Sequence, residues 1–354
     1  MEEIIPDSLL RAVGKVFWIE SFSPVPKTTG AFQFKGRFVY EPEEAYAILS
    51  ADLKPLGYTP LFRKDEDGPK IIVVPGVITE SPPAKFLSLL LFALTLISVV
   101  FTRIFTGERP SLLSGLLFAI ALLGSLGAHE LGHYFVSRRL GSSVSLPYFI
   151  PMPFSPFGTM GAIIRMKSPP LNRRTLIRIG AAGPLAGLVV GIPMTIIGLM
   201  LSKVETLPTN QPYYLEGNSI LYLLIKLLLF GQILPSGGKD VLLHPMAFAG
   251  WASLMVTGLN LIPAGQLDGG HIAYALLGKK AKVLNWVIIG ALLLMGFWWQ
   301  GWFVWALLIA LLGREHARPL DEVTPLKPID RLIAIAMLLI FILLFTPKPL
   351  VLVY

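Results

Sequence analysis

Residues 112–133 read LLSGLLFAIALLGSLGAHELGH, an apolar run that ends with a glutamate between two histidines. A helix needs about 20 predominantly apolar residues to cross the hydrocarbon core of a bilayer, and this run has that length. His129 and His133 are four residues apart, so a helix places both imidazoles on one face, where they can bind one metal ion. Such polar groups are costly inside a membrane unless they have a function. The run therefore predicts a transmembrane helix that carries part of a metal site.

Charge and composition separate the chain into two regions. Of its 354 residues, 54% are hydrophobic, and the formal net charge is +8. Residues 1–83 carry 12 acidic and 9 basic side chains, whereas the remainder carries 10 acidic and 21 basic side chains. Because the basic excess falls in the apolar region, it is typical of cytoplasmic loops of a membrane protein and not of a nucleic-acid surface. We therefore expect contact with a lipid bilayer and no nucleic-acid partner.

Residues 1–83 are predicted to form a small soluble α/β domain. Apolar residues recur with helical spacing over 41–56, where Pro42 lies in the first turn, and Ser81-Pro82-Pro83 ends the domain. Alternating apolar residues predict strands elsewhere in this region. These predicted strands are 32–39, 58–63 and 70–77.

Residues 84–354 are predicted to form the membrane domain, an α-helical polytopic bundle of about six to eight spans. Its core is 86–277, and further spans lie within 283–347. The apolar stretches that predict spans are 86–105, 111–140, 176–201, 245–277, 283–312 and 332–345. The Trp-rich interruption of 283–312 is compatible with one bent span or two short ones, and the second choice gives about seven spans. The apolar stretch 219–234 is short, and we expect it to lie at the outer face.

Two further features define the expected topology. Residues 146–166 are rich in proline, glycine and aromatic residues, so they predict a re-entrant β-hairpin whose backbone is covered by protein. Loops rich in Lys and Arg are expected on the cytoplasmic side. The basic residues that follow the histidine-bearing span are Arg138, Arg139, Arg165, Lys167, Arg173, Arg174 and Arg178. We therefore expect a multi-pass protein of the cell membrane whose N-terminal domain and active-site entrance are cytoplasmic.

The choice of metal ligands is narrow because the chain has no cysteine. A catalytic zinc needs three protein ligands and an open position for water. Apart from Glu130, the only acidic residue inside an apolar span is Asp268, in NLIPAGQLDGGH at 260–271. Pro263 and the glycines interrupt the helix there and allow the backbone to approach a metal. Glu130, next to His129, is placed to take a proton from metal-activated water.

These motifs resemble those of the site-2 protease family of intramembrane zinc metalloproteases, peptidase family M50. H-E-x-x-H at 129–133 is followed more than a hundred residues later by N-x-x-P-x-x-x-L-D-G, which begins at Asn260. The segments FGTMGA at 157–162 and AGPLAG at 182–187 also look like that family, and the likeness covers about residues 86–275. The layout is similar to that of the archaeal and chloroplast members, which have an N-terminal soluble domain and no inserted PDZ domain.

The resemblance implies a site, a cofactor and an activity. One Zn²⁺ ion would be held by His129, His133 and Asp268, with Glu130 as the catalytic base. Asn260 would help to polarise the scissile carbonyl or hold the substrate strand. The implied reaction is hydrolysis of peptide bonds in or near transmembrane segments of membrane-protein substrates.

Three other functions stay open at this point. A zinc transporter or sensor would need polar residues along several spans, and the spans here are otherwise apolar. An inactive scaffold would lack a ligand or the base, whereas all four side chains are present. A membrane zinc protease outside the site-2 family would use a glutamate as third ligand. The candidates for that glutamate are Glu205, Glu216, Glu315 and Glu322.

Overall fold

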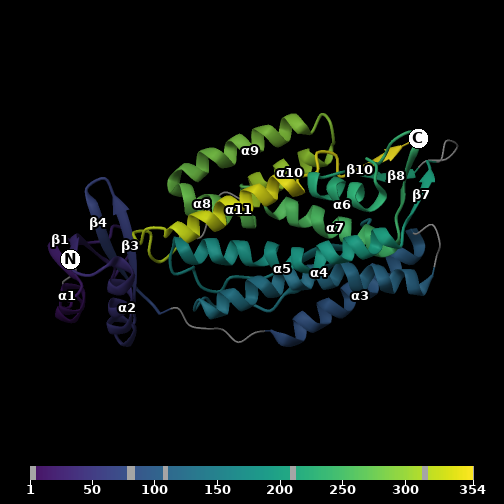
Figure 1. The fold of residues 1–354 in the computed structure, drawn as a ribbon. Coiled ribbons are helices and arrows are strands. Elements are labelled where there is room, and N and C mark those ends of the chain that lie inside the picture. The colour runs from purple at the N-terminus through teal and green to yellow at the C-terminus, as the bar shows by residue number, and fades with distance from the viewer. Residues whose placement is uncertain (1–4, 78–83, 107–110, 208–212, 313–317, 354) are drawn as a thin grey trace.

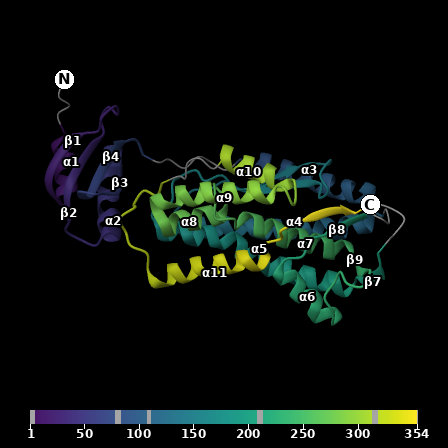
Figure 2. The same cartoon turned by 90° about the horizontal axis from the view of Figure 1, so that it is seen from above.

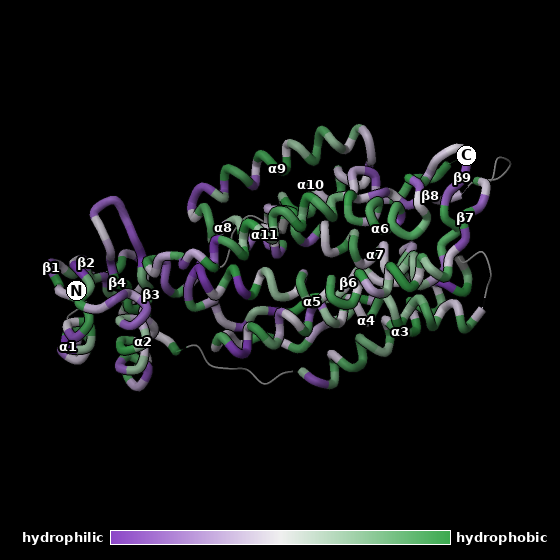
Figure 3. The backbone as a smooth tube through the Cα atoms, in the orientation of Figure 1, coloured by the Kyte–Doolittle hydropathy of each residue, from purple (hydrophilic) through white to green (hydrophobic). Residues whose placement is uncertain are grey.

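A computed structural model of the protein describes residues 5–77, 84–106, 111–207, 213–312 and 318–353. It consists of a small α/β unit at the N-terminus and an elongated group of helices that extends away from it (Figure 1). The view turned by 90° shows the same separation, with the C-terminus near the far end of the helices (Figure 2). Hydrophobic residues predominate along the helices (Figure 3). The predicted boundary Ser81-Pro82-Pro83 and the ligand candidate Glu315 lie outside the described residues.

In the N-terminal unit, two helices share a core with one antiparallel sheet. The elements are α1 (Asp7–Gly14), β1 (Phe17–Pro24), β2 (Phe32–Phe38), α2 (Pro42–Leu53), the 3₁₀ turn η1 (Lys54–Leu56), β3 (Tyr58–Asp65) and β4 (Gly68–Pro75), and the strand order is β1-β2-β4-β3. Leu9 of α1 and Leu49 of α2 are buried against Phe34 and Phe62 of the sheet. Proline at the start of α2 fits the first helical turn, where its missing N–H has no intrahelical partner.

The three predicted strands and the predicted helix of this unit are present, and α1 and β1 are two further elements that were not predicted. Helix α1 has only eight residues, too few to give a clear helical period. In β1 a bulge between Ile19 and Ser21 interrupts the alternation of inward and outward side chains. Both elements are therefore defined by their contacts with the rest of the unit.

The remainder of the chain is mostly helical. Its helices are α3 (Lys85–Thr106), α4 (Leu112–Arg139), α5 (Arg173–Met200), α6 (Ile220–Phe230), α7 (Pro245–Asn260), α8 (Asp268–Leu277), the 3₁₀ turn η2 (Gly278–Lys280), α9 (Ala281–Met295), α10 (Gly301–Leu312) and α11 (Pro328–Leu344). Among the described residues, α3, α4 and α5 are long and apolar enough to cross a membrane. Helices α4, α5 and α7 pack against one another, which brings the N-terminal and C-terminal parts of the bundle together.

Two predicted spans are divided into separate helices. The stretch 245–277 forms α7 and α8, joined by the loop at 261–267, where the sequence predicted a break at Pro263. The stretch 283–312 lies in α9 and α10, which pack against each other across the turn at 296–300. The stretch therefore contains two separate helices and no single continuous one. The short apolar helix α6 has 11 residues, about half the length that a span requires.

Three small sheets accompany the helices. They pair β5 (Tyr148–Pro151) with β6 (Thr159–Ile163), β7 (Lys203–Thr206) with β9 (Lys239–Leu242), and β8 (Tyr213–Glu216) with β10 (Leu350–Val353). The first pair is an antiparallel hairpin within 146–166, as the sequence predicted. Strands β7, β8 and β10 lie at the end of the bundle that is farther from the N-terminal unit (Figure 1).

A short stretch near the C-terminus connects the two parts of the molecule. Residues 319–322, which we call the bridging segment, lie beside the edge strand β3. The N–H of Phe62 donates to Leu320 O at 2.9 Å, and the N–H of Glu322 donates to Phe62 O at 3.1 Å. On its other side, the N–H groups of Leu320 and Asp321 donate to Pro170 O and Leu171 O at 3.0 and 2.8 Å. The N-terminal sheet is thus continued into the chain just before α5.

Candidate metal centre

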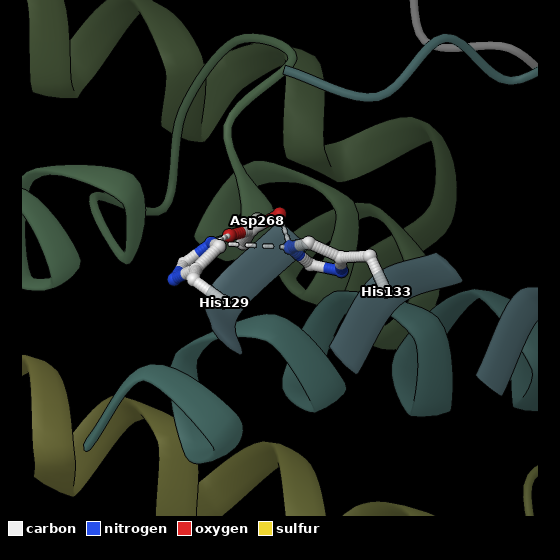
Figure 4. A group of neighbouring side chains, drawn as sticks. All are labelled: His129, His133 and Asp268. Carbon is white, nitrogen blue, oxygen red and sulfur yellow. Dashed lines mark hydrogen bonds and ion pairs between the residues drawn. The ribbon is translucent and has the colours of Figure 1, made fainter. Parts of the chain in front are cut away.

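The two histidines of the H-E-x-x-H motif lie on one face of α4, as their spacing requires. Their ring centroids are 4.9 Å apart, and both side chains are almost completely buried. The Nε2 atoms point toward each other at 3.2 Å, as Figure 4 shows. One helix therefore supplies two converging nitrogen ligands in an apolar environment.

Asp268 completes a triangle with the two imidazoles. It is the first residue of α8 and approaches from the loop that follows α7. Its Oδ2 lies 3.1 Å from His129 Nε2, and its Oδ1 lies 3.2 Å from His133 Nε2. Two ligands of a tetrahedral zinc, each at about 2.0–2.1 Å from the ion, lie about 3.3 Å apart. Each imidazole nitrogen therefore lies at the spacing of two tetrahedral zinc ligands from the other imidazole nitrogen and from one carboxylate oxygen, and a zinc ion held by these three side chains would keep a fourth position for water or substrate.

The donor set also fits the charge of a zinc ion. Two neutral imidazoles and one carboxylate leave a single negative charge in a buried site, and a divalent cation with a bound hydroxide would neutralise it. Among the described residues, these three form the group whose potential ligand atoms lie within 4.8 Å of one another. Glu130 does not belong to this group, so its position agrees with the role of a catalytic base and not with that of a metal ligand.

A hydrogen bond fixes the orientation of one imidazole. His133 Nδ1 lies 2.8 Å from the carbonyl oxygen of Ile179 on α5. A carbonyl only accepts, so Nδ1 carries the proton and Nε2 keeps its lone pair for a metal. The sequence analysis did not identify Ile179, because a backbone acceptor leaves no signature in the side-chain pattern.

Glycines on α5 make room for the imidazoles. A Cβ at Gly183 would collide with the His133 ring, and one at Gly187 would lie 3.2 Å from His129 Nδ1. These two glycines are four residues apart in AGPLAG, so they repeat on α5 the spacing of the histidines on α4. The motif therefore lets α5 pack closely against α4, because the buried rings occupy the space that the missing side chains leave.

Glycines also shape the loop that presents Asp268. Gly265 has a φ of +61°, which favours glycine. A Cβ at Gly269 or Gly270 would collide with backbone oxygens of Leu261 or Gly265. The N–H of Gly265 donates to Asn285 Oδ1 of α9 at 2.7 Å. The loop is therefore compact enough to begin α8 directly beside the histidines.

The predicted base Glu130 lies between the two histidines in sequence and is also buried. The backbone N–H of Ile164, which directly follows β6, donates to its carboxylate. This contact places the end of the β5–β6 hairpin beside the carboxylate. The sequence predicted both the hairpin and Glu130 but not their contact, which joins residues of different elements.

The remaining predicted residues have different positions. Asn260 is the last residue of α7 and is half-buried, and it does not belong to the metal-ligand group. Of the alternative third ligands, Glu216 lies beside Lys226 at 3.6 Å and Glu322 lies beside Arg63 at 3.7 Å. Glu205 belongs to β7, at the end of the bundle farther from the N-terminal unit. The structure therefore brings Asp268 to the histidines, and none of these three glutamates.

The site thus combines a His-Glu-x-x-His helix, a carboxylate from a second helix and an apolar helical surrounding. The family model described as peptidase family M50 matches residues 117–297, just over half of the chain. The match includes every residue of the triangle and the glycines that surround it. The chain belongs to peptidase family M50.

Two curated relatives from Arabidopsis thaliana agree with this assignment. The chain is 30% identical over 358 residues to "Probable zinc metalloprotease EGY2, chloroplastic", an alignment that covers 95% of this chain and 64% of the relative. It is 32% identical over 244 residues to "Probable zinc metalloprotease EGY1, chloroplastic", covering 66% of this chain and 43% of that relative. The chain thus spans less than two thirds of the length of these relatives.

One solved structure is also similar in part. It is described as "Site-2 Protease from Methanocaldococcus jannaschii", with 20% sequence identity and a TM-score of 0.35. The match covers 67% of this chain and 93% of that structure. At this TM-score the similarity does not establish a common fold.

Proposed function

We propose that the protein is an intramembrane zinc metalloendopeptidase that hydrolyses peptide bonds in or near transmembrane segments of other membrane proteins. The observation that carries this proposal is the triangle of His129, His133 and Asp268, whose facing atoms are 3.1–3.2 Å apart. The three residues come from helices of an apolar bundle. A zinc centre in that place can act on substrates that share the bilayer.

In this proposal each polar side chain has one task. His129, His133 and Asp268 hold the ion, which when bound supplies Lewis acidity to the scissile carbonyl and activates a water molecule. Glu130 accepts the proton of the attacking water and transfers it to the nitrogen of the leaving amine. The hydrogen bond to Ile179 keeps the His133 lone pair directed at the metal. Asn260 is assigned to the substrate, as a donor to the carbonyl or the strand that carries it.

The β5–β6 hairpin is the proposed platform for substrate. A transmembrane helix hides its peptide carbonyls in its own hydrogen bonds, so it must unwind before hydrolysis, and an unwound strand needs new backbone partners. Helix α3 faces one side of the hairpin through Ser98 Oγ, which donates to Gly158 O at 2.6 Å, and Thr102 Oγ1, which donates to Pro153 O at 2.9 Å. Strand β6 leads to Ile164 beside the base. A substrate strand paired with β6 would therefore reach Glu130.

The proposed membrane arrangement treats residues 1–83 as a soluble cytoplasmic domain and 84–354 as the membrane domain. Helices α3, α4 and α5 supply three spans, the shorter helices supply the others, and the hairpin is re-entrant. The arginines that end α4 and begin α5 favour the cytoplasm by the positive-inside rule. Arg174 at that end pairs with Glu43 of the N-terminal unit at 2.5 Å, which supports the same side for both.

A single substitution tests the proposal. The full chain is purified in detergent as wild type, as Glu130→Gln and as the control Glu205→Gln, and each is mixed with a generic transmembrane substrate. Glu130→Gln should retain zinc and lose cleavage by about 10²–10⁴-fold, the usual contribution of a general base. Glu205→Gln should match the wild type in both respects. Wild-type cleavage by Glu130→Gln would overturn the proposed mechanism.

A further inference from the structure

The helix that presents Asp268 to the histidines is also attached to the N-terminal unit. Tyr274 lies six residues after Asp268 on α8, a rise of about 9 Å along the helix axis. Its hydroxyl donates to Glu322 Oε1 of the bridging segment at 2.9 Å. One short helix therefore carries a proposed zinc ligand near one end and a hydrogen bond to the bridging segment near the other.

The second oxygen of Glu322 faces the N-terminal sheet. Its Oε2 lies 3.7 Å from Nε of Arg63 on β3, and the two side chains are 21% and 13% exposed. The guanidinium also donates through Nη1 to Pro319 O at 2.9 Å and to Leu320 O at 3.0 Å. Burial lowers the pKa of Arg63, and Glu322 opposes the shift. Glu322 is thus held to the N-terminal unit by an ion pair with Arg63 that is largely shielded from solvent.

The C-terminal end of α8 has a second anchor close by. Arg173, the first residue of α5, donates through Nε to Ala275 O at 2.6 Å and through Nη2 to Leu276 O at 2.9 Å. The chain just before Arg173 is the segment that pairs with the bridging segment. The last turn of α8 is therefore fixed to the start of α5. The N-terminal unit is fixed, through the bridging segment, to the residues just before that start.

Helix α8 needs such anchors because it is short. It has 10 residues, and isolated helices below about 12–15 residues are marginal. A glycine-rich loop precedes it, and Gly278, with a φ of +59°, follows it. The direction of α8 therefore depends on tertiary contacts. Because α8 carries Asp268, a change in its direction would displace this ligand, and a displacement of about 1 Å is enough to impair metal binding and reaction.

We propose that Glu322 and Tyr274 are positioning residues, through which the N-terminal α/β unit sets the orientation of α8 and thus the placement of Asp268 at the zinc site. This inference rests on the proposed function for the identity of the metal. It assigns the N-terminal unit a role in zinc retention and turnover. Glu322, which the sequence offered as an alternative zinc ligand, instead affects the position of Asp268 through Tyr274 and α8.

The test uses the full zinc-loaded protein in detergent and measures the rate of zinc transfer to a chelator. Tyr274→Phe removes only the hydroxyl, and Glu322→Ala removes both contacts. Each should speed zinc release by about 10-fold, the lower range for residues that orient metal ligands. The double variant should be no faster than Glu322→Ala, because both changes remove the same link. Glu322→Gln keeps an acceptor for Tyr274 but loses the ion pair with Arg63, so its zinc release should also be faster than that of the wild type.

The matched control is Glu43→Ala. It removes the interdomain pair with Arg174 but does not affect the Tyr274–Glu322 bond. Its zinc release should equal that of the wild type. Equal release in all variants, or equal acceleration by Glu43→Ala and Glu322→Ala, would overturn the inference. The proposed function fails separately, since it requires Asp268→Ala to lose zinc whatever the result at Glu322.

Discussion

Two of the buried polar clusters in the described helical part of the molecule differ in the source of positive charge. In the metal centre, Asp268 faces two imidazoles. In the second, which we call the Lys226 cluster, the fully buried Nζ of Lys226 lies 3.6 Å from Glu216 Oε1 and 3.5 Å from Asp240 Oδ1. The Lys226 cluster thus contains its own cation. The metal centre has neutral partners for its carboxylate and is suited to an external cation.

This contrast shows that burial of polar groups does not by itself identify a catalytic site. Lys226 also lies over the Tyr222 ring, with Nζ 4.8 Å from its centroid, and the Tyr222 hydroxyl donates to Glu216 at 3.2 Å. The charges and the ring of the cluster therefore connect α6 with β8 and β9. A buried carboxylate beside a lysine has its counter-charge within the protein, whereas a buried carboxylate that faces two imidazoles completes a donor set for a metal ion.

The largest expected effect is the loss of zinc when Asp268 of the metal centre is replaced. Asp268→Ala removes one of three ligands and the only negative charge of the triangle. We expect zinc affinity to fall by at least about 10²-fold and cleavage to fall to the background. Metal analysis and a cleavage assay would check this. Full zinc content in Asp268→Ala would show that another residue is the third ligand.

The converse substitution is Lys226→Met. It leaves two buried carboxylates without their cation, and breaking a buried pair in this way costs about 3–5 kcal/mol of stability. Zinc stoichiometry in the fraction that folds should equal that of the wild type. Thermal unfolding and metal analysis in detergent measure the two quantities. If Lys226→Met lost zinc at unchanged stability, the assignment of the two clusters would be reversed.

A smaller effect is expected from the glycines around the imidazoles. In Gly183→Ala the new methyl group collides with His133, so the ring must shift and zinc affinity should fall by about 10-fold or more. Gly124→Ala on α4 is the matched control, because nothing lies within 4 Å of its added Cβ. A chelator competition series compares the two. Equal zinc affinities would mean that α5 does not confine the rings.

The smallest effect concerns the pH dependence of the Lys226 cluster. Glu216 lies in β8, outside the three candidate spans, and burial raises its pKa to about 7. The folded state therefore keeps a proton that the unfolded chain releases near pH 4.5, so stability falls as pH rises from about 4.5 to about 7 and changes little above that.

Glu216→Gln cannot ionise and should lose this dependence. Between pH 5 and 8, the wild type should lose about 1–3 kcal/mol of stability relative to Glu216→Gln. Unfolding curves of the two proteins at several pH values would measure the difference. Parallel pH profiles would show that Glu216 titrates normally.

The parts of the site that the sequence predicted are those with local signatures. H-E-x-x-H and L-D-G each have a fixed spacing, and the scarcity of acids in apolar spans singled out Asp268. The paired strands in 146–166 and the break near Pro263 also follow from local composition. Each of these features depends on neighbouring residues, which the sequence displays directly.

The contacts that the sequence did not predict join distant residues. Gly183 is recognisable as a packing residue, but that it accommodates His133 depends on how α5 meets α4. The ladder from β3 through the bridging segment joins residues more than 250 positions apart. Glu216 and Glu322 were open ligand candidates because nothing local revealed Lys226 or Arg63 as their partners.

The central claim is that one zinc ion binds at the triangle of His129, His133 and Asp268. Anomalous diffraction at the zinc edge, on crystals of the full protein, tests it most directly. The account predicts one peak about 2.0–2.2 Å from both Nε2 atoms and from an Asp268 carboxylate oxygen. A peak at Glu216 and Asp240, or one that persists at full height in Asp268→Ala, would contradict it.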